Sequence, residues 1–255
     1  MTGTSLKPLL AELLASYGGL EYATCEDGRT VITGPYALDA SYDGIRLAED
    51  FDLQLTIPAN YPESLPRARE LSDIIAPSYE HLFVDGSFCL GVQGELLIAQ
   101  LKDPSLARLY DGPVRSYLYS YLFHERYGRY PFGDRAHGTK GILQFYSEFF
   151  GETDPIKTWR LLMSACTEEY RGHLPCPCGS GIAGRKCHGD AVLRLKRSGA
   201  ISGAKDDLNE TLREFSRARA ESEKRRLAFK KAGIDLNVPD PIDVFFQTTA
   251  RLISL

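Results

Sequence analysis

The sequence has no long apolar run, no internal repeat and no low-complexity tract. A membrane-spanning helix needs about 20 consecutive apolar residues, and no stretch of the chain approaches that length. The first residues also lack the basic start and the small-residue cleavage site of a secretory signal peptide. The same stretch predicts an amphipathic helix, because leucines recur in it at helical spacing. They are Leu6, Leu9, Leu10, Leu13 and Leu14. We therefore expect a cytoplasmic protein with no membrane partner.

Net charge is also small, at −4 for the 255 residues, but it is unevenly distributed. Residues 1–150 carry 12 Lys and Arg against 20 Asp and Glu, whereas residues 151–255 carry 18 against 14. An acidic front half and a basic back half predict two units with different surfaces. Nothing in the acidic half suggests a nucleic-acid partner.

Three stretches of the front half predict β-strands. The segment 51–57 alternates apolar and polar residues with the two-residue period of a half-buried strand, and Pro58 closes it. A strand is also expected at 30–34 and a short last one within 67–73, with the residues 39–44 forming a turn.

Helical patterns follow from about residue 95, with Pro113 as an expected helix start and another short helix at 139–151. A strand meander followed by helices predicts an α+β fold.

Cysteines are few, and three of the six lie within twelve residues. In a cytoplasmic chain such clustering indicates a metal site rather than disulfides. In "CPCGSGIAGRKCHG", Cys176 and Cys178 precede Cys187 and His188, which supplies four soft ligands for tetrahedral zinc. Because the protein fills all four positions, we predict one structural zinc ion rather than a catalytic one.

The pattern C-x-C-x8-C-H resembles the SEC-C motif, which occurs at the C-terminus of the bacterial secretion motor SecA and in many other proteins. The resemblance implies a zinc knuckle that mediates protein contacts. Where the motif usually carries a basic, aromatic loop, this chain has "IAGRK".

A second resemblance covers residues 5–150, where a meander leads into a proline loop, then a histidine, then "DGSFCLG". The residues that carry it are Gly34, Tyr61, Pro62, Pro66, His81, Gly86, Cys89 and Leu90. In their order and spacing they resemble the ubiquitin-conjugating enzymes. The resemblance implies an α+β domain with an N-terminal helix, an antiparallel meander and C-terminal helices. We expect a small zinc knuckle and a C-terminal helix after this domain.

The same resemblance implies that Cys89 receives a ubiquitin-like modifier, or another protein C-terminal tail, as a thioester. An activating enzyme would supply the modifier, and a target amine or a partner protein would take it. The stretch "PFGDRAHGTKG" (131–141) is similar to divergent bacterial members, which occur in antiviral defence operons that include CBASS-type systems. A thiolate on an exposed loop suits this transfer, since thioester exchange is close to isoenergetic.

The chain differs from the family at a position that is important for transfer to an amine. The family usually has His-Pro-Asn where this chain has His81-Leu82-Phe83. His137 is the candidate substitute as base, acid or oxyanion donor, and Asp85 the candidate to orient an incoming lysine. His81 is a candidate for catalysis or for support of the loop.

By this reading the chain divides into a ubiquitin-conjugating-enzyme-like domain (1–152), a linker helix (153–174), the zinc motif (175–192) and a last segment (193–255). The last segment would hold a basic helix at 206–232 and an apolar tail.

Two other interpretations stay open. The chain could be a catalytically inactive adaptor that binds a ubiquitin-like or partner protein through the same fold and the SEC-C motif, which the missing Asn favours. Alternatively, the zinc motif and the basic helix carry the function by contacting ribosomes or acidic chaperones, and Cys89 is a structural cysteine.

Overall fold

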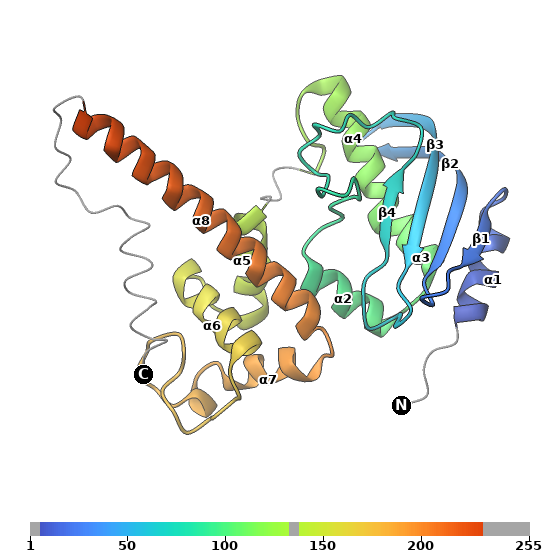
Figure 1. The fold of residues 1–255 in the computed structure, drawn as a ribbon. Helices are drawn as coiled ribbons and strands as arrows, with labels where there is room; N and C mark the ends of the chain where they lie inside the picture. Colours follow the sequence, from blue (N-terminus) through green and yellow to red (C-terminus); the bar gives the residue numbers. More distant parts are fainter. Residues whose placement is uncertain (1–5, 133–137, 232–255) are drawn as a thin grey trace. The chain divides into compact units, whose positions relative to one another are not determined.

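The computed structural model describes residues 6–132 and 138–231, and the chain divides into two compact units between residues 135 and 136 (Figure 1). The sequence placed the boundary near residue 152. The helix α5 (Gly138–Phe150) instead belongs to the second unit, because it packs on the helices that follow it.

The first unit is built on a four-stranded antiparallel sheet in the order β1-β2-β3-β4, a simple meander (Figure 1). Its strands are β1 (Glu21–Thr24), β2 (Thr30–Tyr42), β3 (Ile45–Ile57) and β4 (Arg67–Glu70). Together with the helices, this meander confirms the predicted α+β class.

The strand β2 runs through residues 39–42, where the sequence predicted a turn. The turn itself is only two residues long, Asp43 and Gly44, with φ values of 48° and 76°. Positive φ at both central residues is the conformation that joins two strands without splaying them. The long β2–β3 hairpin therefore continues to its tip.

One face of the sheet forms the core of the first unit. The predicted alternation in β3 is confirmed, since Phe51, Leu53, Leu55 and Ile57 are all buried. They pack in one cluster with the buried leucines of α1 (Leu6–Ser16), among them Leu13.

A continuous helical stretch covers this core. It consists of α3 (Leu106–Leu109), the π-helical turn η1 (Tyr110–Val114) and α4 (Arg115–Tyr127). Pro113 lies inside this helical stretch, so the prediction that it starts a helix is wrong. Proline lacks an N–H and its ring crowds the carbonyl one turn earlier, so a wider π turn at this position lets the helix continue.

The proline loop at 60–66 is fixed against the helix α2 (Gln93–Lys102) and the residues after it. The amide of Gln100 donates to the carbonyls of Pro62 and Ser64, at 2.7 and 2.9 Å. The hydroxyl of Tyr61 donates to the carbonyl of Pro104 at 2.6 Å.

In the described part of the second unit the regular structure is helical, apart from one isolated β-bridge. After α5 come α6 (Pro155–Thr167), the 3-10 turn η2 (Gly184–Lys186), α7 (Gly189–Arg197) and α8 (Ile201–Lys231). Of the predicted linker helix at 153–174, only the part that forms α6 is helical. This helix is the centre of the bundle, because it packs against α5, α7 and α8. Trp159, Leu161 and Leu162 are buried, and the indole N–H of Trp159 donates to Thr211 of α8 at 2.9 Å.

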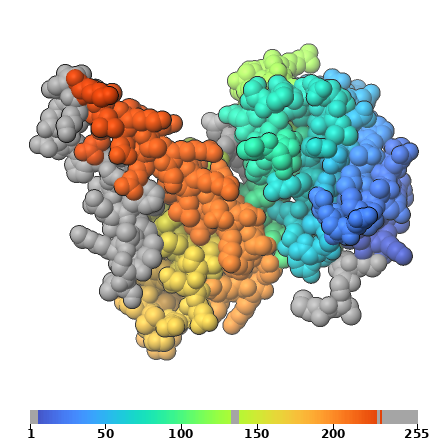
Figure 2. Space-filling view, viewed as in Figure 1, coloured from blue at the N-terminus to red at the C-terminus, as the bar shows by residue number. Residues whose placement is uncertain are grey.

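The predicted basic helix corresponds to α8, whose later turns are largely exposed (Figure 2). Near the start of this helix Leu208 is buried, whereas Leu212, one turn later, is exposed. Among the helices of the described residues, none combines the length and apolarity needed to cross a membrane.

Candidate functional site

Cys89 ends a short hairpin beside the last strand of the sheet. Its backbone N–H donates to the carbonyl of His81 at 2.8 Å, and Phe83 N–H donates to Ser87 at 2.8 Å. Gly86, with a φ of 75°, makes the tight turn between them, as its place in "DGSFCLG" suggests. Phe88 N–H donates to Ala68 of β4 at 2.8 Å, which fixes the hairpin to the sheet.

The helix α4 holds the same backbone from the other side. The buried hydroxyl of Tyr117 donates to the carbonyl of His81 at 3.0 Å, so this one carbonyl accepts from both Tyr117 and Cys89. The Tyr117 ring also stacks on Phe88, with centroids 4.3 Å apart. Cys89 itself is partly exposed. The arrangement is a partly exposed cysteine on a backbone that is held at several points.

His81 supports this hairpin through its backbone, while its ring packs among aromatic side chains. The imidazole is only 10% exposed and meets the rings of Tyr79 and Tyr130 edge-on, each at 5.2 Å. Its Nε2 lies 3.6 Å from the carboxylate of Glu80, which accepts a hydrogen bond from the Tyr130 hydroxyl at 2.7 Å. This geometry suits loop support better than proton transfer.

Asp85 is engaged in its own turn. Its carboxylate accepts from the N–H of Ser87 at 3.0 Å and from the Ser87 hydroxyl at 2.5 Å, and it lies 3.7 Å from Arg67. The hydrogen bond from the Ser87 hydroxyl is the main cause that lowers the pKa of Asp85. The side chain is still 57% exposed, so an approaching ammonium group can reach it. His137 lies outside the described residues.

The four predicted metal ligands come together in the second unit. One ligand atom from each of Cys176, Cys178, Cys187 and His188 lies within 4.8 Å of the others. Cys178 Sγ is 3.7 Å from Cys187 Sγ, and His188 Nδ1 is 3.6 Å from Cys176 Sγ and 3.2 Å from Cys187 Sγ. Such a group can hold a metal ion.

Local backbone explains why these residues meet. Pro175 and Ala183 form a β-bridge, and Cys176 N–H donates to Ile182 at 2.7 Å, which folds the glycine-rich loop back on itself. The turn η2 then leads to Cys187, and His188 stands immediately before α7.

The pKa values of the first two thiols are shifted in opposite directions. Burial raises the pKa of Cys176 to about 12. Burial also opposes ionisation of Cys178, but hydrogen bonds from Ser180 lower the pKa of that thiol to about 7. Thiolates are the form that binds metal, and a bound cation would favour the charged form of all three thiols.

One residue near the cluster was missed by the sequence reasoning. The carboxylate of Glu152, in the corner between α5 and α6, lies 3.8 Å from His188 Nε2. No spacing rule relates Glu152 to the motif, so only the fold could reveal it.

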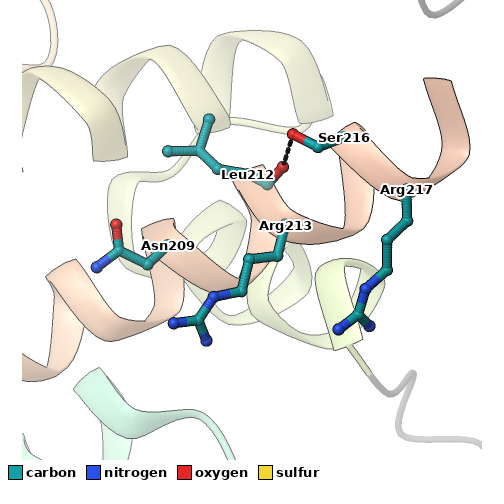
Figure 3. Close-up of a pocket in the computed structure, with 5 residues that line it drawn as sticks. All are labelled: Asn209, Leu212, Arg213, Ser216 and Arg217. Carbon is teal, nitrogen blue, oxygen red and sulfur yellow. Dashed lines mark hydrogen bonds between the residues drawn. The ribbon is translucent and has the colours of Figure 1, made fainter. Parts of the chain in front are cut away.

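A shallow surface pocket lies on one face of α8, lined by Asn209, Leu212, Arg213, Ser216 and Arg217 (Figure 3). The Ser216 hydroxyl donates to the Leu212 carbonyl of its own helix at 2.8 Å, and Arg213 is 3.5 Å from Glu210. These contacts lie within the helix, and none of the five residues belongs to a predicted site.

No protein-family model matches the chain, and neither a curated protein nor a solved structure shows significant similarity to it.

Proposed function

We propose that the chain is a ubiquitin-conjugating-enzyme-like transferase that accepts a protein C-terminus on Cys89 and carries one structural zinc ion in its second unit. The observation that carries the first part is the partly exposed Cys89, which stands on a hairpin fixed to both β4 and α4. A helix followed by a four-stranded meander, as the resemblance implies, also supports it.

The transfer is an exchange of thioesters. The sulfur of Cys89 attacks the terminal carbonyl carbon of a ubiquitin-like modifier, which the activating enzyme holds as a thioester. The bond to the activating enzyme's sulfur breaks, and that sulfur takes up the proton that Cys89 loses. An amine of the target then attacks the new thioester, forms an amide and returns the Cys89 thiol.

Fixing the backbone serves this chemistry because a nucleophile on a rigid loop needs less reorganisation to reach the carbonyl. In this proposal His81 positions Cys89 through its carbonyl, and Asp85 lies on the exposed side of the turn where a lysine would approach.

Charging with a modifier tests the proposal. The protein is incubated with ATP, Mg²⁺, an activating enzyme and the modifier which that enzyme carries, and it is analysed on a non-reducing gel. We expect an adduct that thiols cleave, a thiol-resistant ester in Cys89→Ser and no adduct in Cys89→Ala. The variant Cys25→Ala, which removes an exposed cysteine elsewhere, should charge as the wild type does.

An adaptor remains the second candidate, and one observation favours it. The polar groups described beside Cys89 are already engaged, with the His81 ring packed against Tyr79 and Tyr130 and Asp85 bonded to Ser87. An adaptor would bind the modifier with equal affinity in wild type and Cys89→Ala and would form no adduct, even though the activating enzyme itself is charged.

The zinc assignment follows from the donor set. Bond lengths of about 2.3 Å to sulfur and about 2.0 Å to nitrogen put tetrahedral ligands about 3.8 Å (S to S) or about 3.5 Å (S to N) apart. The Cys178–Cys187 separation of 3.7 Å and the Cys176–His188 separation of 3.6 Å fit these values, and the Cys187–His188 separation of 3.2 Å is somewhat shorter. Zinc would join the 175–183 hairpin to the start of α7. Elemental analysis should find one zinc per chain.

A further inference from the structure

His188 presents its two ring nitrogens to different partners. Nδ1 faces the sulfurs of Cys176 and Cys187, and Nε2 faces the carboxylate of Glu152 at 3.8 Å. Both side chains of this pair are largely buried, with 16% of His188 and 13% of Glu152 exposed. The imidazole therefore lies between the sulfur cluster and a sheltered negative charge.

The corner between α5 and α6 holds Glu152 in place. Its Oε1 accepts from the N–H of Asp154 at 3.0 Å, which leaves Oε2 directed at His188. Its backbone carbonyl accepts from the hydroxyls of Ser147 and Thr158. The carboxylate is thus positioned by the helical bundle and not by the Cys/His motif.

A metal ion bound through Nδ1 requires the remaining ring proton to be on Nε2, where it points toward Glu152. Metal-bound histidines commonly donate this second N–H to a carboxylate, which fixes the tautomer and the ring orientation and increases the basicity of the ligand. A sheltered carboxylate in turn needs a donor or a positive charge nearby.

We propose that Glu152 is a positioning residue of the metal site: through His188 Nε2 it orients the ring for Nδ1 coordination and connects the site to the α5–α6 corner. This inference rests on the metal site of the proposed function. The separation of 3.8 Å is longer than a hydrogen bond, so the proposal requires the two groups to approach each other when the metal binds.

The variant Glu152→Gln tests this role. Its amide oxygen can still accept from Asp154 N–H, while the negative charge beside His188 is lost. We expect zinc affinity, measured by competition with a chromophoric chelator, to fall by about 10-fold. Glu148→Gln makes the same change at an exposed position of α5 and should leave the affinity unchanged.

A spectroscopic measurement on the zinc-loaded wild type supplies a readout that needs no variant. The Nε2 proton of His188 should give an NMR signal shifted downfield and protected from exchange, because it is hydrogen-bonded and sheltered. In Glu152→Gln the signal should move or vanish, while circular dichroism shows that the helices persist.

The outcomes separate the two proposals. If the wild type binds no zinc, both the metal site and the role of Glu152 are overturned. If the wild type binds zinc and Glu152→Gln binds it equally well, with the His188 signal unchanged, only the role of Glu152 is overturned.

Discussion

The three thiols outside the Cys/His cluster differ in their surroundings. Cys25 is exposed, Cys89 is partly exposed and Cys166 is buried in α6. Burial raises the pKa of Cys166 to about 12. Since only the thiolate reacts, Cys166 should be far less reactive at pH 8 than an ordinary thiol.

We therefore predict that iodoacetamide at pH 8 modifies Cys25 and Cys89 of the folded protein and spares Cys166. Peptide mass spectrometry after timed labelling measures the three rates, and labelling in urea provides the fully exposed control. Equal rates for Cys166 and Cys25 in the folded protein would contradict the prediction, and an unreactive Cys89 would count against its accessibility.

Asp85 should make the free energy of unfolding depend on pH. The hydrogen bond from the Ser87 hydroxyl lowers its pKa from the usual 3.8. A carboxyl whose pKa falls on folding stabilises the folded chain above the unfolded pKa, and this contribution is lost as the pH falls through the folded value.

The variant Asp85→Ala should therefore unfold more easily than the wild type at pH 7, by less than about 1 kcal/mol because the group is mostly exposed. The difference should shrink as the pH falls below 3.8. Urea unfolding at several pH values measures it, with Asp50→Ala as an exposed control in β3. A difference independent of pH would show that charge at Asp85 is not the cause.

At the scale of elements, the β2–β3 hairpin depends on its two-residue turn. Gly44 has a φ of 76°, which a residue with a Cβ adopts only at a cost. Gly44→Ala should lower the free energy of unfolding by about 1 kcal/mol, although no atom stands in the way of the new methyl group.

Gly112 offers the matched control for this prediction. It lies in the helical turn η1, its φ is not positive, and open space surrounds the position of a Cβ. Gly112→Ala should be neutral or slightly stabilising in the same urea experiment. If both variants lose the same stability, backbone conformation is not what distinguishes the two glycines.

The elements that could be predicted were those with a strong local pattern. The alternation in β3 and the leucine spacing in α1 could be predicted because each element buries one face. By contrast, β1 was missed because all four of its residues are exposed and show no alternation. The end of β2 was mistaken for a turn because its residues are of the types that favour turns, although they pair with β3 as far as Tyr42 opposite Ile45.

At the scale of the whole molecule, the sequence predicted the candidate ligands but not the residues that support each candidate site. Cys176, Cys178, Cys187 and His188 are close in sequence, so their spacing alone predicted the cluster. The support of each site comes from distant parts of the chain, and no local pattern could predict it. Tyr117 reaches the Cys89 hairpin from α4, and Glu152 reaches His188 from the α5–α6 corner.

The division into two units makes a prediction about metal removal. Each unit has its own buried core, and all four candidate ligands belong to the second. Between Thr167 and Gly189 the chain has little regular structure, and the cluster lies within this stretch. Losing the metal should therefore loosen the second unit and spare the first.

Limited trypsin digestion with and without 1,10-phenanthroline tests this expectation. Arg185 and Lys186 are already exposed, but they lie in η2 between the ligand pairs, where bound metal would hold their backbone. The chelator should free this backbone, so cleavage there should accelerate while a fragment containing the sheet persists. The non-chelating isomer 1,7-phenanthroline is the control, and added zinc should restore protection. Identical digestion with both isomers would mean that the cluster holds its shape without metal, and a loss of the sheet fragment would mean that the first unit depends on the second.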